Sequence, residues 1–292
     1  MKYTQLGQTG IRISMVAYGG IVSSGFYGGV HYPSEGQEAS DRYVAWAIDR
    51  GVNYFDVAPG YGNAQEQLGI SLKPYRGGVS LACKTGFRDR ENAEKDLENS
   101  LRLLKTDCFD VYQLHGVSSM EEVDRAFGTG GVMELMAGLK DRGIARFIGF
   151  TAHSEEAALR MLELFPFDTV LFPFNWFLHL EHGMGSRLLE VLKQKDIGIL
   201  AMKAFIERRW NEGEDKGRFP KSWCKPIDTA ADPDWGVAAM NYALSLGART
   251  LVPPGNFESF RFAVEHIDEC TGRPDMALLR DRLEKVRGKE FF

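Results

Sequence analysis

Eight short apolar runs, separated by stretches with helical periodicity, restrict the fold of this 292-residue chain more than any other feature. Each run is nearly continuous in apolar residues, as expected for parallel strands that are buried on both faces. Eight strands alternating with helices predict an α/β chain folded as a (β/α)8 TIM barrel, which we expect to occupy residues 1–292 as a single domain. The runs are Met15–Tyr18, Val52–Val57, Val79–Cys83, Cys108–Leu114, Ala145–Phe150, Thr169–Phe174, Ile197–Met202 and Thr250–Val252.

Three segments fall outside this alternation. Residues 2–15 carry apolar side chains on both sides of the turn Gly7–Gly10, which predicts a short N-terminal β-hairpin capping the bottom of the barrel. Residues 25–36 are rich in Gly and Tyr, and residues 207–234 form a long polar stretch with several aromatic residues. Long loops after barrel strands are often functional, because they lie at the active-site end. The alternative is an insertion that only packs its aromatic residues onto the barrel.

Charge and composition exclude several classes of partner. The formal net charge is -5 and no block rich in Lys and Arg occurs, which argues against nucleic acid and anionic membrane surfaces as partners. No apolar run reaches the roughly 20 residues of a membrane helix. The four cysteines are scattered without CxxC spacing, which predicts reduced thiols instead of disulfides or structural zinc. We therefore expect a cytoplasmic protein.

Polar side chains stand at the ends of three predicted strands. Asp56 lies at the end of the second run, Lys84 follows the third and His115 follows the fourth, while Tyr61 lies in the Pro59–Gly62 turn just after Asp56. The carboxyl ends of barrel strands share one rim, so we expect these four side chains to meet. Taken singly, each also fits a structural role, as a capping acid, a solvated lysine, a hydrogen-bonded histidine and a packing tyrosine.

Together the four side chains suggest a carbonyl reduction. Asp56 can pair with Lys84 and keep its ammonium charged when buried. A cation beside Tyr61 favours the phenolate, which predicts a pKa lowered from ~10 by roughly two or three units, the equivalent of roughly 3–4 kcal/mol. Tyr61 would then serve as a general acid, and His115 would donate to the carbonyl oxygen of the substrate. No side chain supplies a hydride, so a nicotinamide cofactor is expected.

Several motifs surround these residues: Phe55-Asp56-Val57-Ala58 with Tyr61-Gly62, Glu66-x-Leu68-Gly69, Cys83-Lys84-Thr85, Asp110-Val111-Tyr112-Gln113-Leu114-His115 and Arg146-Phe147-Ile148-Gly149-Phe150. Together these motifs resemble one known family, the aldo-keto reductases, over most of the chain. The resemblance implies an (α/β)8 barrel that reduces an aldehyde or ketone to an alcohol with NADPH, with Asp56, Tyr61, Lys84 and His115 as the catalytic residues.

The positions that hold the nicotinamide in this family are partly replaced. A Ser-Asn pair and a Gln hold the carboxamide in the family, and the corresponding positions here resemble Thr151-Ala152 and Leu171. Thr151 keeps a hydroxyl, whereas Ala152 and Leu171 have no side-chain hydrogen-bonding group. Met202 stands where the family often stacks a tyrosine on the ring, and Lys203 is either a phosphate ligand or a strand-end lysine, of which we expect the former.

The loop Val252–Phe257 resembles a shortened phosphate-binding segment. It lacks the usual Lys/Arg and Ser contacts to the adenosine 2′-phosphate, and Glu258 would repel that phosphate and accept from a free ribose hydroxyl. NADPH is therefore the expected cofactor and NADH the alternative. The cofactor-binding residues expected from the resemblance are Gly20, Thr151, Met202, Lys203, Pro254, Gly255, Asn256, Glu258 and Arg261, and no metal ligand is expected.

Two other functions stay open at this point. The replaced carboxamide positions fit a cofactor-sensing or partner-binding barrel with weak chemistry. A barrel lyase, isomerase or metal-dependent hydrolase is the other, and His153, His179 and His182 motivate its metal-dependent form. The complete set of four candidate catalytic residues favours a reductase acting on a small-molecule carbonyl.

Overall fold

In a computed structural model, which describes residues 1–289, eight strands form one sheet of parallel pairs in the order β14-β11-β10-β9-β8-β7-β6-β3. A bridge between Val16 and Leu251 joins its two edges, where the Ala17 amide donates to Leu251 O at 2.9 Å. The (β/α)8 barrel is confirmed, although the predicted domain 1–292 ends in residues 290–292, which lie outside the described part. The strands are β3 Tyr18–Gly19, β6 Tyr54–Asp56, β7 Ser80–Thr85, β8 Phe109–Val117, β9 Ala145–Ala152, β10 Thr169–Phe172, β11 Gly198–Met202 and β14 Thr250–Val252.

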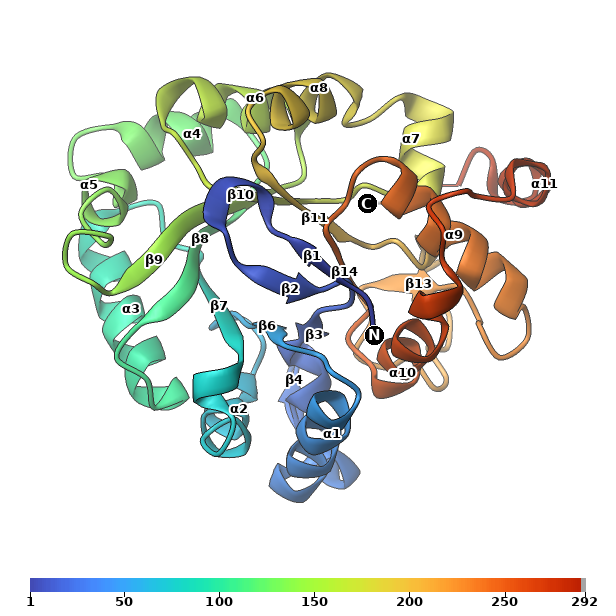
Figure 1. The fold of residues 1–292 in the computed structure, drawn as a ribbon, viewed down its shortest axis with the longest axis horizontal. Coiled ribbons are helices and arrows are strands. Elements are labelled where there is room, and N and C mark those ends of the chain that lie inside the picture. Colours follow the sequence, from blue (N-terminus) through green and yellow to red (C-terminus); the bar gives the residue numbers. More distant parts are fainter. Residues whose placement is uncertain (290–292) are drawn as a thin grey trace.

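Helices cover the outside of the barrel (Figure 1). Several begin at a side-chain N-cap, such as Asp89, which accepts from the Asn92 amide, and Ser154, which accepts from the Ala157 amide. Within residues 1–289, none of the helices is both long and apolar enough to cross a membrane. The helices are α1 Gln37–Asp49, α2 Ala64–Ser71, α3 Arg90–Leu104, α4 Met120–Phe127, α5 Val132–Met136, α6 Glu155–Leu164, α7 Trp176–His182, α8 Ser186–Gln194, α9 Pro233–Ser245, α10 Phe257–His266 and α11 Met276–Val286.

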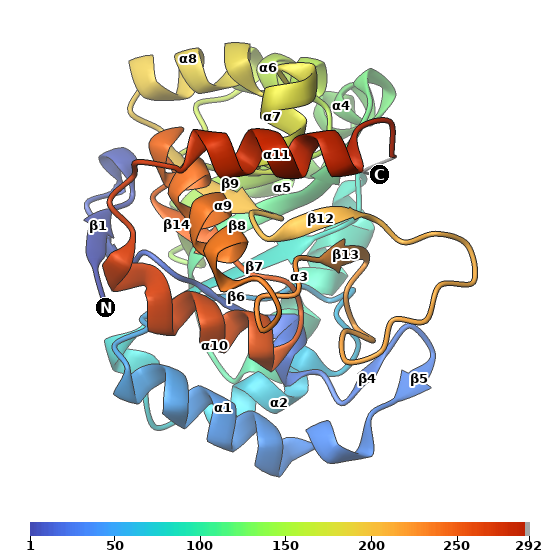
Figure 2. The same ribbon diagram turned by 90° about the vertical axis from the view of Figure 1, so that its right-hand side faces the viewer.

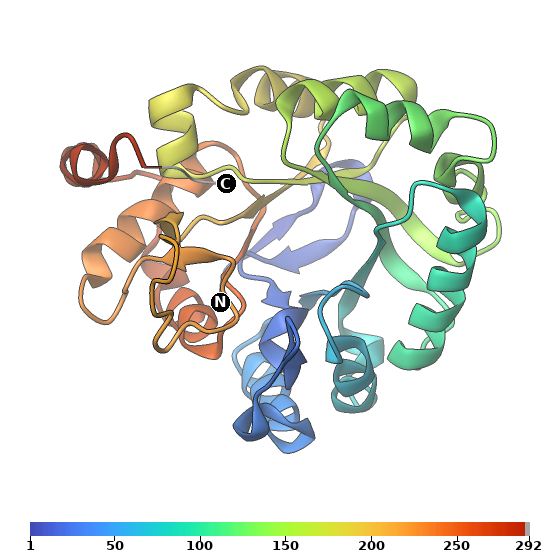
Figure 3. The same ribbon diagram turned by 180° about the vertical axis from the view of Figure 1, so that it is seen from behind.

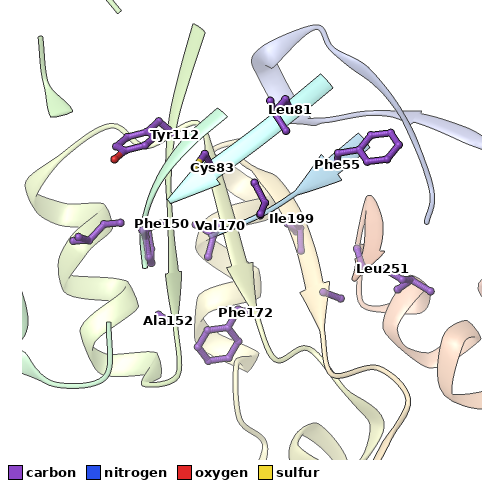
Figure 4. Packing of buried hydrophobic residues seen from close by; sticks show 14 of the residues in the cluster. Phe55, Leu81, Cys83, Tyr112, Phe150, Ala152, Val170, Phe172, Ile199 and Leu251 are labelled. Atoms are coloured by element: carbon purple, nitrogen blue, oxygen red, sulfur yellow. The ribbon is translucent and has the colours of Figure 1, made fainter. Parts of the chain in front are cut away.

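Side chains alternate between the two faces of each barrel strand. Phe55 and Leu81 belong to the large apolar cluster between strands and helices (Figure 4). Ala82, Val111 and Leu200 belong to a separate cluster that fills the barrel interior. Because both faces are buried, the strands read as continuous apolar runs, and this is why the sequence predicts them well.

The N-terminal hairpin closes one end of the barrel, as predicted. Strands β1 (Tyr3–Gln5) and β2 (Arg12–Ser14) pair antiparallel, and Leu6 between them joins the interior cluster. A Cβ at Gly198, the first residue of β11, would lie 2.7 Å from Leu6 Cδ1, so only glycine lets the hairpin approach this closely. Figure 2 shows β1 at one end of the barrel and β12 and β13 toward the other.

The two long segments form small antiparallel ribbons at the carboxyl ends of the strands (Figures 2 and 3). Residues 25–36 contain β4 (Phe26–Tyr27) and β5 (Val30–His31), and the second segment contains β12 (Ile206–Arg209) and β13 (Cys224–Pro226). Buried Lys221 connects the two. Its ammonium group donates to the carbonyls of Ile21, Val22 and Ser24 at 3.0, 2.9 and 3.2 Å and pairs with Glu35.

Candidate active site

A buried ion pair joins two neighbouring strands at the centre of the site. Asp56 is the last residue of β6 and pairs in the ladder with Ala82, two positions before Lys84 on β7, so both side chains face the barrel interior. Lys84 Nζ donates to Asp56 Oδ1 and lies 3.4 Å from Val57 O. The two side chains are 0% and 1% exposed. Charges this deeply buried need a partner, and each supplies it for the other.

Tyr61 lies on the turn that follows β6. Its amide donates to Ala58 O at 3.1 Å, and the next residue, Gly62, has φ +62° and approaches the backbone so closely that a side chain would collide with Phe26 O. Asn63 Oδ1 accepts from the amides of Gly25 and Phe26 at 3.0 and 3.1 Å. These contacts hold the turn against the segment that leads into β4, and they place the Tyr61 ring centroid 5.4 Å from Lys84 Nζ.

His115 lies on β8, near the carboxyl end of the strand. Its ring meets the Tyr61 ring edge-on, with centroids 5.8 Å apart and an angle of 86° between the planes. Asp56, Tyr61 and His115 line one cleft, and fully buried Lys84 lies against Asp56 and the Tyr61 ring. The structure thus brings together the four side chains that the sequence singled out.

Comparison with known proteins gives the family. A model of the aldo/keto reductase family matches residues 26–225. The chain belongs to the aldo/keto reductase family. Aldo-keto reductase YhdN of Bacillus subtilis (strain 168) is 30% identical over 250 residues, covering 77% of this chain and 71% of that protein. L-galactose dehydrogenase of Arabidopsis thaliana is 25% identical over 213 residues, covering 67% and 63%.

A solved structure supports the same fold. The holo form of aldo-keto reductase AKR11C1 from Bacillus halodurans matches with a TM-score of 0.71 at 18% identity, covering 100% of this chain and 98% of that one. Since the curated relatives are named as a reductase and a dehydrogenase, membership of the aldo/keto reductase family supports an oxidoreductase.

The expected lowering of the Tyr61 pKa is wrong for this aldo/keto reductase structure. Burial raises the pKa of the Tyr61 phenol above its ordinary value; Lys84 opposes this increase and Asp56 adds to it. The prediction counted the favourable charge of Lys84 but left out the cost of burying the phenolate, which is the largest cause of the shift. The Asp56 carboxylate, which is bound to Lys84, also opposes the effect of that cation at the phenol. Tyr61 is therefore protonated at neutral pH, the state a proton donor requires.

Their surroundings set the protonation states of Lys84 and His115. Burial is the largest single influence on Lys84 and opposes its charge, but Asp56 and Tyr61 act together in the other direction, so the pKa of the ammonium is raised and it stays protonated. Burial, with Lys84 as the second cause, lowers the pKa of His115 to about 3. The imidazole is therefore neutral and has one N–H to donate to a ligand.

We expect the two histidines of the cleft to make the protein less stable in acid. Burial lowers the pKa of His153 to about 4, and that of His115 to about 3, from an ordinary 6.5. Below about pH 6.5 the unfolded chain binds protons that the folded chain does not, so the free energy of unfolding falls as pH drops toward 4, by up to about 1.4 kcal/mol per pH unit for each histidine. Urea unfolding from pH 7.5 to 4.5 measures this. The loss should be reduced in a His115→Gln/His153→Gln variant, and a double variant as acid-sensitive as the wild type would contradict the assignment.

Five of the expected cofactor-binding residues line the same cleft: Thr151, Met202, Lys203, Pro254 and Gly255. The other four do not. A Cβ at Gly20 would collide with Val57, so this glycine allows close packing, and its neighbours Gly19 and Ile21 line the cleft instead.

Asn256 caps α10 by accepting from the Ser259 amide at 2.9 Å. Glu258 and Arg261 line a second depression together with Arg218 and Glu265. Whether these residues bind cofactor stays a prediction.

The carboxamide positions differ in their surroundings. Leu171 lines the cleft as an apolar wall, whereas Ala152 is fully buried in the outer cluster and does not line the cleft. The Thr151 hydroxyl accepts from the Gly116 amide at 2.6 Å, which leaves its own O–H as a donor. His153 also lines the cleft, and its amide donates to Val117 O at 2.9 Å.

Sequence reasoning missed the residues that the second long segment contributes. Trp223 is 55% exposed, lines the cleft and stacks on Tyr27, with ring centroids 6.2 Å apart. The segment therefore forms part of the cleft wall and does more than pack onto the barrel. The aromatic residues of the segment were the available signal of a functional role, but no local sequence pattern predicts that the segment lies against the cleft. The cleft residues from this segment and the adjoining turn are Ile206, Lys221, Ser222, Trp223 and Cys224.

The histidines that motivated a metal-dependent alternative have other contacts. His179 Nδ1 lies 2.7 Å from the Tyr242 hydroxyl, and the His182 ring packs edge-on against Phe177. In the part of the chain that the structure describes, no group of three or more His, Cys, Asp or Glu side chains is arranged to hold a metal ion.

Proposed function

We propose that this protein is an NAD(P)H-dependent aldo-keto reductase that converts an aldehyde or ketone to its alcohol. The observation that carries the proposal is the buried Lys84–Asp56 pair beside the Tyr61 phenol, with neutral His115 edge-on to that phenol in one cleft. An isolated ion pair would be a structural feature. With a proton donor and a hydrogen-bond donor beside the ion pair, the site can stabilise a carbonyl oxygen that gains negative charge.

The cleft has surfaces that suit a nicotinamide cofactor. Leu171, Met202 and Val252 offer an apolar wall to a flat ring, and Thr151 keeps a hydroxyl donor for the carboxamide. Lys203 and the loop through Pro254 and Gly255 would hold the phosphates. Burial lowers the pKa of Lys203 to about 8, so most of its ammonium is charged at neutral pH. A bound dihydronicotinamide supplies the hydride that no side chain can.

The residues of the chain then act on the substrate oxygen. His115 donates its N–H and polarises the carbonyl, which prepares the carbon for attack. Tyr61 donates its proton as negative charge develops on the oxygen. Lys84 stabilises the phenolate that remains, and Asp56 keeps Lys84 charged and oriented within the barrel. The proposed substrate is a small carbonyl compound. The proposed location of the protein is the cytoplasm.

The second depression bears on the choice between NADPH and NADH. It contains two arginines, which attract a 2′-phosphate, and two glutamates, which repel it: Arg218, Arg261, Glu258 and Glu265. Arg218 pairs with Glu258 and Asp228, so part of its charge is already compensated. NADPH is the expected cofactor and NADH the alternative, and only a direct comparison of affinities separates them.

The test is a titration with NADPH and NADH, followed by a panel of aldehydes and ketones with the cofactor that binds. Because Trp223 lines the cleft, we expect binding to quench protein fluorescence, and Trp223→Phe to remove much of the quench. Calorimetry of the same variant controls for changes in affinity. If neither cofactor binds, the proposal fails. If one binds but no carbonyl is reduced above background, a cofactor-sensing barrel becomes the better description. Of the two alternative functions this is the one that the apolar side chain of Leu171, at a carboxamide position, favours.

A further inference from the structure

Strand β8 is irregular at the candidate catalytic histidine. Its pairing with β9 runs regularly to Leu114, opposite Phe150, and resumes with Val117 opposite Ala152. His115 and Gly116 therefore stand opposite the single residue Thr151, which makes this a β-bulge. Gly116 has φ +68°, a left-handed conformation that favours glycine. Bulges of this kind redirect a side chain, and here the redirected side chain is His115.

Side chains from both neighbouring segments satisfy backbone groups of the bulge. The Gly116 amide donates to Thr151 Oγ1 at 2.6 Å, and the His115 carbonyl accepts from Arg88 Nη2 at 2.9 Å. Ser118 Oγ donates to Gly116 O at 3.1 Å. The carbonyl and the amide of the His115–Gly116 peptide group are thus both held by specific partners, and so is the carbonyl of the peptide group that follows, which restricts where the imidazole can point.

Arg88 is itself firmly held. Its side chain is 7% exposed, and its Nη1 donates to Gly86 O at 3.0 Å. Its Nη2 also lies 3.1 Å from Glu122 Oε1, and the other oxygen of Glu122 accepts from the Ser118 amide at 2.6 Å. The planar guanidinium contacts three acceptors at once, an arrangement that a lysine ammonium does not reproduce. Arg88 follows β7, so it links the strand of Lys84 to the strand of His115.

We propose that Arg88 is a positioning residue, which fixes the His115 bulge so that the imidazole faces Tyr61 in the cleft; this role rests on the proposed function. Arg88 does not line the cleft and acts through the His115 carbonyl. Its loss therefore impairs the step in which the carbonyl is oriented and leaves cofactor binding intact. The cation also opposes protonation of His115, because Arg88 lowers the histidine pKa as the fourth cause, after burial, Lys84 and His153.

A double-mutant cycle between Arg88→Gln and His115→Gln tests this role, with kcat for carbonyl reduction and cofactor Kd as readouts. We expect Arg88→Gln to lower kcat by roughly 10–100-fold in the wild-type background, because small displacements of an orienting group have effects of this size. In the His115→Gln background the loss should be below about twofold, with cofactor Kd unchanged in both. Equal losses in the two backgrounds overturn the proposal, and so does wild-type kcat in folded Arg88→Gln.

Two further variants separate geometry from charge and from stability. Arg88→Lys keeps the cation but not the planar fork, so its kcat should fall like that of Arg88→Gln. Wild-type activity in Arg88→Lys would overturn the geometric role. Arg76→Gln is the matched control, because Arg76 links the opposite ends of β7 and β8 through Val79 O, Cys108 O and Asp110. It should lower stability while kcat stays within about twofold, since it lies outside the site.

A measurement without turnover keeps the two proposals distinguishable. In NMR spectra of the six histidines, His115 should not titrate above pH 5 in the wild type, because its pKa is about 3. In Arg88→Gln and Arg88→Lys, a loosened bulge admits water and the pKa should rise toward its ordinary value. If this shift occurs but the wild type reduces no carbonyl, the proposed function fails and the positioning of His115 stands. If carbonyls are reduced and neither the titration nor kcat changes in the variants, only the positioning role fails.

Discussion

Tyr61→Phe is expected to lower kcat for carbonyl reduction by roughly 10²–10⁴-fold, the range that general acid catalysis contributes. The substitution removes one hydroxyl and leaves the ring that packs edge-on against His115 and beside Lys84. The apolar wall for the cofactor is untouched, so the Kd of NADPH or NADH should stay within about twofold. Steady-state kinetics with the best substrate of the panel, together with a cofactor titration, measures both quantities.

Replacement of the tryptophan that lines the cleft would not have this signature. Trp223→Phe, which also alters an aromatic residue of the cleft, should change KM more than kcat, because Trp223 has no acidic proton to donate to the substrate oxygen. Undiminished turnover in Tyr61→Phe would show that another group protonates the product. A large loss of cofactor affinity would instead place Tyr61 in the binding of the ring.

Lys84→Met is expected to destabilise the protein by about 3–5 kcal/mol, because it leaves the Asp56 carboxylate buried without its cation. The loss should depend on pH. Burial already raises the pKa of Asp56 while Lys84 opposes the increase, so removing Lys84 raises that pKa further. Above about pH 4 the unfolded chain releases this proton and the folded chain keeps it, so the free energy of unfolding of the variant falls as pH rises from about 4 to 8. Urea unfolding at pH 5 and pH 8 measures the difference.

The matched control is Asp56→Asn in the Lys84→Met background. The double variant contains no buried charge at this position, so it should regain part of the lost stability, and the extra pH dependence should disappear. Both variants should lack activity, because nothing then stabilises the phenolate of Tyr61. A single variant as stable as the wild type at pH 8 would mean that water or another cation reaches Asp56, contrary to its 1% exposure.

The small departures from the predicted strands have local physical reasons. The predicted run Met15–Tyr18 overlaps β3 at one residue, but its Val16 makes the bridge that closes the barrel. Lys84 was expected just beyond its strand but lies within β7. The strand continues through this polar residue because the aliphatic part of the side chain is buried and its charge is paired with Asp56.

The site was less predictable than the fold wherever it depends on contacts between distant segments. Lys221 contacts the carbonyls of Ile21 and Val22, which lie about 200 positions earlier in the chain, and no local sequence pattern predicts such a contact. The direction of the Tyr61 pKa shift was predicted wrongly for the same reason. It depends on how completely the phenol is buried and on how closely Asp56 compensates Lys84, both of which are properties of packing.

The order of apolar runs and polar strand ends by itself determined the barrel and the set Asp56, Tyr61, Lys84 and His115. Parallel strands bring their carboxyl ends to one rim whatever the loops do, so a one-dimensional pattern is sufficient. Only the tertiary structure decided what surrounds that set: the cleft wall from residues 221–224, the protonated state of Tyr61 and the bulge that Arg88 and Thr151 hold around His115. These features arise from burial and from bonds between segments far apart in the chain, and neither is encoded in the local sequence.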